Sequence, residues 1–104
     1  MKIKEKTQIN NKTLLEIFKA SENALNNMGL KITYSNLEEG LIEAVESSFW
    51  YGYKDDIIIR IERLISDDIK IDIRSASRIG KSDFGVNSIR IKTVLEKISS
   101  NLKD

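Results

Sequence analysis

Two short segments in which isoleucine occupies every second position constrain the fold of this chain more than any other feature. The isoleucines are Ile57, Ile59 and Ile61 in the first segment and Ile69, Ile71 and Ile73 in the second. A period of two belongs to a β-strand, because successive side chains of a strand point to opposite faces of the sheet. We therefore predict two half-buried strands that turn their isoleucines to one face of an antiparallel sheet.

The charged residues of these two strands predict how the strands pair. The register that sets Ile61 opposite Ile71 also sets opposite charges against each other, Glu62 against Lys70 and Arg60 against Asp72. A slip by two residues would set Arg60 against Lys70, and like charges directly opposite each other are unfavourable. We predict the first register.

Two further strands are expected before the isoleucine strands. Residues 30–35 alternate apolar Leu30, Ile32 and Tyr34 with polar residues, 36–40 form a turn, and 41–51 are rich in residues that favour strands. Residues 52–56 are then a short polar connection. Within 41–51, alternation places Phe49 and Tyr51 in the core and Trp50 on the face that bears arginines.

Apolar residues at three- and four-residue spacing predict a helix over 12–28. Thr13 and Glu16 have capping-box spacing at its start, with Asn10 and Asn11 as alternative caps, and Gly29 is suited to end it. A second helix follows residues 75–85, with an apolar face made of Ile91, Val94, Leu95, Ile98 and Leu102. Asn87 is its expected N-cap, and Val86 with Ile91 has the spacing of a hydrophobic staple.

These elements give one α+β domain in the order αββββα, a four-stranded antiparallel meander with both helices packed on one face. A chain of 104 residues is long enough for one hydrophobic core and too short for two. We expect residues 1–11 to be a polar N-terminal tail and 12–104 to be the domain.

Composition excludes several classes of function. The chain has no His and no Cys, which removes Ser-His-Asp triads, Cys-His dyads, disulfides and ordinary zinc sites. The net charge is only +1, which argues against nucleic acid as a partner. No signal peptide or apolar span is present, and the sequence as given predicts a small soluble cytoplasmic protein without cofactor, a monomer or weak dimer, unless an export signal has been trimmed from it.

Residues 73–87, IRSASRIGKSDFGVN, are followed by Arg90 and Ile91, and this segment resembles the signature of the family called domain of unknown function 1499. Residues 53–56, YKDD, resemble the aromatic-x-Asp-Asp turn of that family, and Ala44 and Ser48 match its preceding strand. The resemblance covers about residues 14–98. It implies relatives among bacterial proteins, often exported, and plant plastid proteins, and no assigned reaction or ligand. A Pro-Asn-Cys segment that commonly precedes the domain is missing here.

The segment 74–90 is the strongest candidate site. It gathers three guanidiniums, several hydroxyl and amide side chains and two glycines before a helix N-terminus, a combination suited to an anion. The candidate ligand-binding residues are Arg74, Ser75, Ser77, Arg78, Ser82, Asp83, Asn87 and Arg90. The same segment also suits a purely structural crossover in which Asp83 accepts hydrogen bonds from loop amides or from Arg78.

Two pairs of carboxylates, Asp55 with Asp56 and Asp67 with Asp68, lie at expected hairpin connections, where Asp is common without any metal. We predict no metal site there, and Asp56 is a possible partner for Arg74 or Arg90.

Three functions remain open. The first is a non-enzymatic binding module that recognises a small anionic molecule or an acidic peptide with segment 74–90. The second is a carboxylate-based hydrolase or isomerase that uses Asp83 or Asp56 as base and Arg78 as stabiliser. The third is self-association through a sheet edge.

Overall fold

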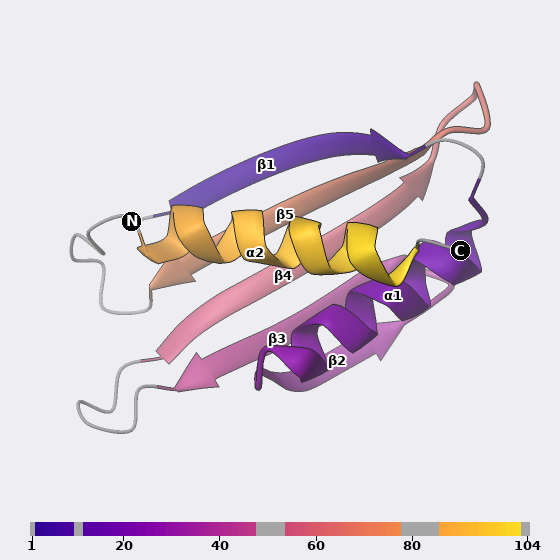
Figure 1. The fold of residues 1–104 in the computed structure, drawn as a ribbon. Helices are drawn as coiled ribbons and strands as arrows, with labels where there is room; N and C mark the ends of the chain where they lie inside the picture. The colour runs from indigo at the N-terminus through magenta and orange to yellow at the C-terminus, as the bar shows by residue number, and fades with distance from the viewer. Residues whose placement is uncertain (1, 10–11, 48–53, 78–85, 103–104) are drawn as a thin grey trace.

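The fold is a five-stranded antiparallel sheet that carries two helices on one face (Figure 1). The computed structural model describes residues 2–9, 12–47, 54–77 and 86–102. Seven elements follow one another along the chain: β1 (Lys2–Ile9), α1 (Leu14–Asn27), β2 (Lys31–Asn36), β3 (Leu41–Ser47), β4 (Lys54–Arg63), β5 (Ile69–Ser77) and α2 (Val86–Asn101). Across the sheet the order is β1-β5-β4-β3-β2.

The four-stranded meander predicted from the sequence is confirmed in β2 to β5. The predicted register of β4 and β5 is also confirmed, since Ile61 pairs with Ile71 and Glu62 with Lys70. The Nζ atom of Lys70 lies 3.5 Å from a carboxylate oxygen of Glu62, so the cross-strand ion pair forms. The pairing of opposite charges thus selects the register here.

The expectation of a polar tail over residues 1–11 is wrong for most of that segment, because β1 pairs with β5 along its whole length from Lys2 opposite Ala76 to Ile9 opposite Ile69. A strand at the edge of a sheet is held by its backbone hydrogen bonds and tolerates polar and charged residues. The segment therefore lacks the strong apolar alternation from which strands are predicted.

Strand β2, at the opposite edge, departs from the alternation expected for it. Its pairing with β3 shifts between Ile32 and Tyr34, which marks a β-bulge. A bulge inserts one extra residue and changes which face the following side chains occupy. Leu30 and Ile32 precede the bulge and are buried and half-buried as expected, whereas Tyr34 follows it and is exposed instead of facing the core.

Helix α1 begins as predicted at a capping box. The Oγ1 atom of Thr13 accepts a hydrogen bond from the backbone N–H of Glu16, and the backbone N–H of Thr13 donates to the Glu16 carboxylate, each at 3.1 Å. The chain leaves the helix through Gly29, whose φ of 78° is readily accessible to glycine. Thr13, rather than Asn10 or Asn11, is therefore the N-cap.

Helix α2 begins at Val86, two residues before the start expected from an N-cap at Asn87. Asn87 is therefore inside the first turn and is not the N-cap, and Val86 is not the preceding residue that a hydrophobic staple requires. The predicted apolar face is correct at its centre, where Ile91, Val94 and Ile98 are buried.

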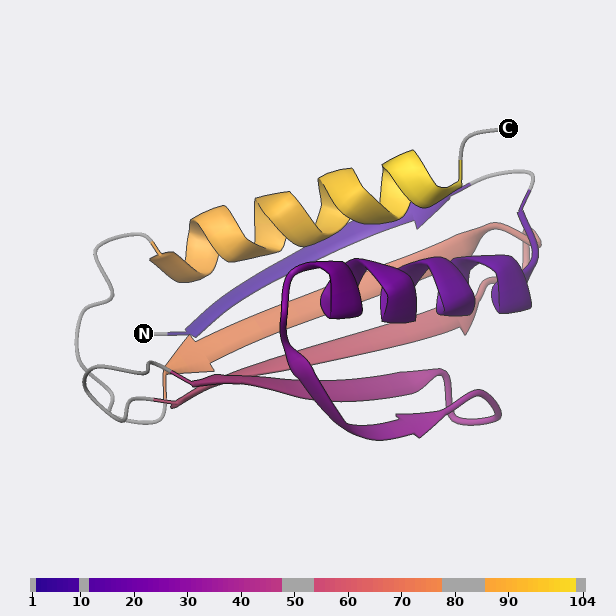
Figure 2. The same cartoon turned by 60° about the horizontal axis from the view of Figure 1, so that its bottom comes forward.

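The core lies between the sheet and the two helices, which cover the same face side by side (Figure 2). The isoleucines of β4 and β5 predicted to be buried are all less than a tenth exposed, and Ile17, Phe18 and Leu25 of α1 pack on them. Ser21 is buried too, with its hydroxyl donating to the carbonyl of Ile17 at 2.8 Å.

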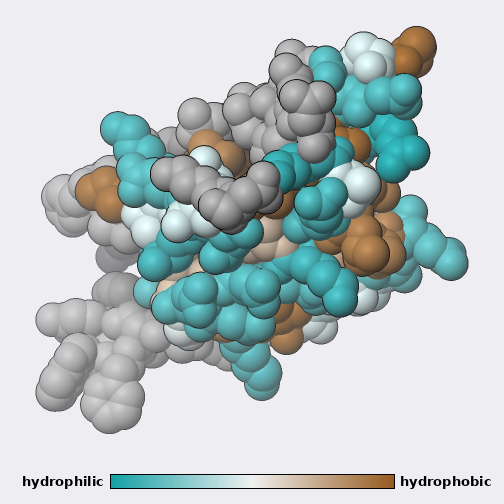
Figure 3. Space-filling model, turned by 45° about the vertical axis from the view of Figure 1, so that its right-hand side comes forward, coloured by the Kyte–Doolittle hydropathy of each residue, from teal (hydrophilic) through white to brown (hydrophobic). Residues whose placement is uncertain are grey.

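Two turns close the meander at the end of the sheet where α1 begins. In the first, Gly40 has a φ of 63° and its carbonyl accepts a hydrogen bond from the N–H of Ile61 at 2.7 Å. In the second, Asp67 has a φ of 69° and the Ser66 hydroxyl donates to Asp68. Figure 3 shows this end with mostly hydrophilic side chains and a few apolar ones, and Ile65 in the second turn is fully exposed.

Candidate functional site

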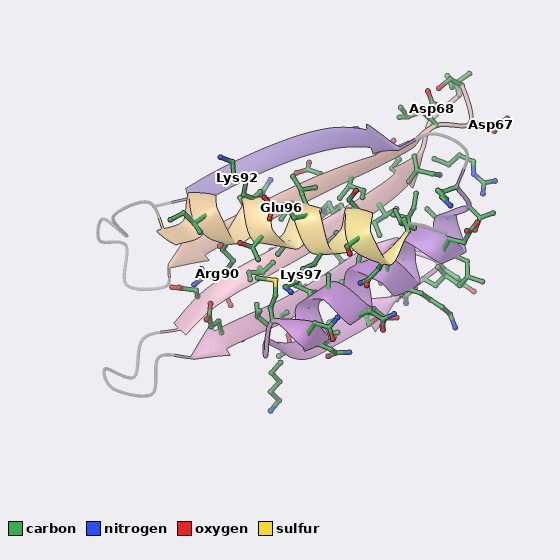
Figure 4. The ribbon with its side chains drawn as sticks, viewed as in Figure 1. Asp67, Asp68, Arg90, Lys92, Glu96 and Lys97 are labelled. Carbon is green, nitrogen blue, oxygen red and sulfur yellow. The ribbon has the colours of Figure 1, made fainter. Side chains whose placement is uncertain are left out.

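Among the described residues, Arg90 in the second turn of α2 is the charged residue that is buried. Its side chain is only 8% exposed. The Nη1 atom donates to the hydroxyl oxygen of Ser75 at 3.2 Å, and the Nη2 atom lies 2.5 Å from Glu46 and 2.9 Å from Asp55. Figure 4 shows Arg90 reaching from α2 toward the end of the sheet where β3 stops and β4 starts. We call these four residues the Arg90 cluster.

Strand alternation explains why the partners of Arg90 meet on the helix-covered side. Glu46 continues the buried row of Ile42 and Ala44 in β3, and Asp55 precedes Ile57 in the buried row of β4. The register sets Glu46 directly opposite Asp55. Two carboxylates in that position repel each other, and the guanidinium between them offsets the repulsion.

The charges of the Arg90 cluster decide what it can bind. One guanidinium is matched by two carboxylates, so the cluster carries a surplus of negative charge. The Nη1 group of the guanidinium already donates to Ser75. A further anion at Arg90 would have to displace Glu46 or Asp55. The cluster therefore fastens α2 to the ends of β3, β4 and β5, and no buried side-chain nitrogen or oxygen among the described residues is left without a hydrogen bond.

The structure divides the predicted anion site between the two faces of the sheet. Ser75 and Arg90 come together under α2, whereas Arg74 lies on the opposite face, which we call the outer face. The side chains of Ser77, Arg78, Ser82, Asp83 and Asn87 lie outside the described part of the structure, although the backbones of Ser77 and Asn87 belong to β5 and α2. The site thus stays a prediction.

Arg74 lies on the outer face in β5, the strand next to the edge strand β1. It is half-buried, opposite Ile58 of β4 on one side and opposite Lys4 of β1 on the other. Arg60 is its diagonal neighbour on β4, since Arg60 pairs with Asp72. None of the hydrogen bonds or ion pairs that involve described residues engages the guanidinium of Arg74.

Sequence reasoning did not assign Glu46 or Asp55 to Arg90, and it left both Arg74 and Arg90 open as partners of Asp56. Asp56 alternates to the outer face, so Asp55 is the residue that reaches Arg90. Both aspartates belong to β4 rather than to a connection before it. Asp55 lies two residues before Ile57, so the alternation of β4 could have placed it on the same face as the buried isoleucines. Phe49, Trp50, Tyr51 and Tyr53 fall outside the described residues.

Among the described residues, Glu16 and Tyr34 have shifted pKa values. Hydrogen bonds from the backbone and hydroxyl of Thr13 lower the pKa of Glu16. The hydrogen bond of the Tyr34 hydroxyl to Glu39 raises the pKa of Tyr34. Both groups stabilise local structure, at the start of α1 and beside the turn after β2. Within the described residues, no group of three or more acidic side chains is placed to hold a metal ion, and no helix is long and apolar enough to cross a membrane.

Comparisons with known proteins agree with this picture of the fold. The model of a family described as "Protein of unknown function (DUF1499)" matches residues 2–98. Among solved structures, the vertebrate conserved region (VCR) of human METTL16 has a TM-score of 0.57 at 10% identity, with 100% of both chains covered. Ara h 8.0201 has a TM-score of 0.49 at 11% identity, covering 100% of this chain and 99% of that one. No curated protein matches the sequence. At such identities the first likeness shows the fold alone.

Proposed function

Because the chain belongs to the DUF1499 family of proteins of unknown function, its role has to be argued from its own residues, and we propose that it is a non-enzymatic binding module for an anionic partner. The partner is recognised by segment 74–90 together with the outer face beside it. A small anionic molecule and an acidic peptide segment share the required chemistry.

The observation that carries the proposal is the position of Arg74. Arg74 is a half-buried residue on a sheet face that neither helix covers, and no described residue engages its guanidinium. Arg60 is within diagonal reach on the neighbouring strand. Guanidiniums bind carboxylate and phosphate groups through two parallel hydrogen bonds, so two of them on one open face suit such a partner.

The Arg90 cluster supports the proposal indirectly, because it separates two roles that segment 74–90 combines. Arg90 is held by Glu46 and Asp55, and so fixes where β5 and α2 lie. Arg74, one residue before the Ser75 that Arg90 contacts, is thereby held in place on the other face. A rigid support of this kind lowers the entropy that binding would lose.

A carboxylate-based enzyme has less support. A base at neutral pH needs a carboxylate in an enclosed site. Asp55 is occupied by Arg90, and Asp56 lies on the open outer face.

The proposal is tested by calorimetric titration of the protein with phosphate, a nucleotide and a dicarboxylate at low salt. We expect one of these anions to bind, and Arg74→Gln to weaken that binding by roughly tenfold, the effect of losing a hydrogen bond to a charged group. Lys19→Gln on the exposed side of α1 is the control with the same change of charge. Unchanged affinity in Arg74→Gln, or a loss of equal size in Lys19→Gln, contradicts the proposal.

A further inference from the structure

The free edge of β1 lies next to the part of the outer face that carries Arg74, and we infer that the anionic partner is an extended acidic peptide that adds to β1 as a sixth strand. This inference rests on the proposed function and narrows it to one class of partner. It is argued from the position of β1 in the sheet, from the register of β1 with β5 and from the charges at that register.

Strand β1 is the outermost strand of the described sheet. It pairs with β5 on one side over all eight of its residues, and no described strand pairs with its other side. Every second backbone N–H and C=O group along such an edge points away from the sheet and offers a hydrogen bond to a strand from another molecule. Peptide recognition by strand addition uses an edge of this kind.

Lysines recur at alternate positions of β1 and meet β5 at defined places. The register pairs Lys2 with Ala76, Lys4 with Arg74 and Lys6 with Asp72. Directly opposed residues of an antiparallel pair belong to the same face of a sheet, so these three positions join the row of Lys70 and Arg74 on the outer face. The β5 residues opposite the three lysines include one carboxylate, Asp72, and Asp72 already has an interaction partner.

This charge pattern selects among the strands that could pair with the edge. Lysine on an edge strand keeps neutral strands of other molecules from pairing there. An acidic strand is attracted by positive charge at this edge, where the register sets two basic residues, Lys4 and Arg74, opposite each other. The match requires carboxylates at every second position of the partner, on the side that continues the outer face.

A peptide fits these observations better than a nucleic acid. Only a peptide backbone satisfies the donors and acceptors of a strand edge in register. Single-stranded nucleic acid binds sheet surfaces through bases stacked on aromatic side chains. The described outer-face residues of β3, β4 and β5 include no aromatic side chain, and Tyr34 of β2 lies at the edge of the sheet opposite to β1.

The test is fluorescence anisotropy of a labelled peptide of about ten residues that alternates glutamate with valine, added to the full chain at low salt. Three further probes are the same peptide with its valine amides N-methylated, an oligothymidylate of equal charge, and inorganic phosphate. Lys4→Gln is compared with Lys31→Gln, which removes the same charge from β2 at the opposite edge. Thermal melts verify that both variants fold.

We expect saturable binding of the alternating peptide, at least fivefold weaker binding by Lys4→Gln, no change in Lys31→Gln, and no binding of the N-methylated peptide. Equal binding of the N-methylated peptide overturns strand addition, as does tighter binding of the oligothymidylate. If phosphate binds and the peptide does not, strand addition fails and the proposed function stands. If nothing binds, both fail.

Discussion

Replacing Arg90 by methionine should lower the free energy of unfolding by about 3 kcal/mol. Removing one partner of a buried ion pair typically costs about 3–5 kcal/mol, because the remaining charge stays buried without compensation. Asp55 is only 20% exposed and meets that description, whereas Glu46 at 44% keeps much of its hydration, which places the expected value at the lower end. Methionine fills a similar volume, so little of the loss comes from packing.

Urea denaturation followed by circular dichroism measures this change, which corresponds to a fall in Tm of roughly 15 °C for a domain of this size. A second variant replaces the carboxylates as well, Arg90→Met with Glu46→Gln and Asp55→Asn. It should recover most of the stability, because no unpaired charge remains. A single variant within about 0.5 kcal/mol of the original protein, or a triple variant no better than the single one, would refute the reasoning.

Three further perturbations test other parts of the fold. Gly40→Ala should destabilise by about 2 kcal/mol or more, since its Cβ would lie 2.1 Å from a backbone oxygen of β4 and its φ is positive; an unchanged urea midpoint contradicts this. Thr13→Ala should lower the free energy of unfolding by about 1 kcal/mol, because the N-cap is lost. The pKa of Glu16 is lowered in the folded protein, so its stabilising effect should be present above pH 4.5 and disappear as the pH falls through the folded pKa. Thr13→Ala should weaken this acid dependence of stability. The pKa of Tyr34 is raised in the folded protein, so its hydrogen bond to Glu39 should stabilise the fold below pH 10 and lose that effect as the pH rises through the folded pKa. In thermal melts over this range, the Tm of Tyr34→Phe should depend less on pH than the Tm of the original protein.

Strands whose two faces differ were predictable from sequence. In β4 and β5 one face is isoleucine and the other carries charges, so both the strand and its register follow from local pattern and cross-strand charge. The start of α1 was predictable for a similar reason, since Thr13 and Glu16 satisfy backbone groups that lie within one turn of them.

The two edges of the sheet were not predictable in the same way. Strand β1 is specified by pairing with β5, whose partner residues lie 60 or more positions away in the chain, and its own residues are mostly polar. The bulge in β2 between Ile32 and Tyr34 depends on how β2 meets β3. Non-local backbone pairing of this kind leaves little trace in local periodicity.

The candidate site was predictable in its arginines and not in their roles. That Arg74 and Arg90 flank the segment was visible, but alternation alone sends Arg74 and Ser75 to opposite faces, and only the pairing of β3 with β4 brings Glu46 and Asp55 to Arg90. The anion-binding hypothesis treated the arginines as one group. The structure separates Arg90, which holds the fold, from Arg74, which faces outward, and Arg78 lies outside the described residues.

The central claim is that an anionic partner binds the outer face around Arg74 while Arg90 stays in its cluster. Amide NMR spectra of labelled protein, titrated with phosphate, a nucleotide, a dicarboxylate, magnesium and calcium, test it most directly. The account predicts saturable shifts for an anion at Arg74 and across the strand at Ile58, with the side-chain Nε–H signal of Arg90 unmoved. Shifts confined to Arg90 and Glu46, or no shift in segment 74–90 with any anion, would contradict it.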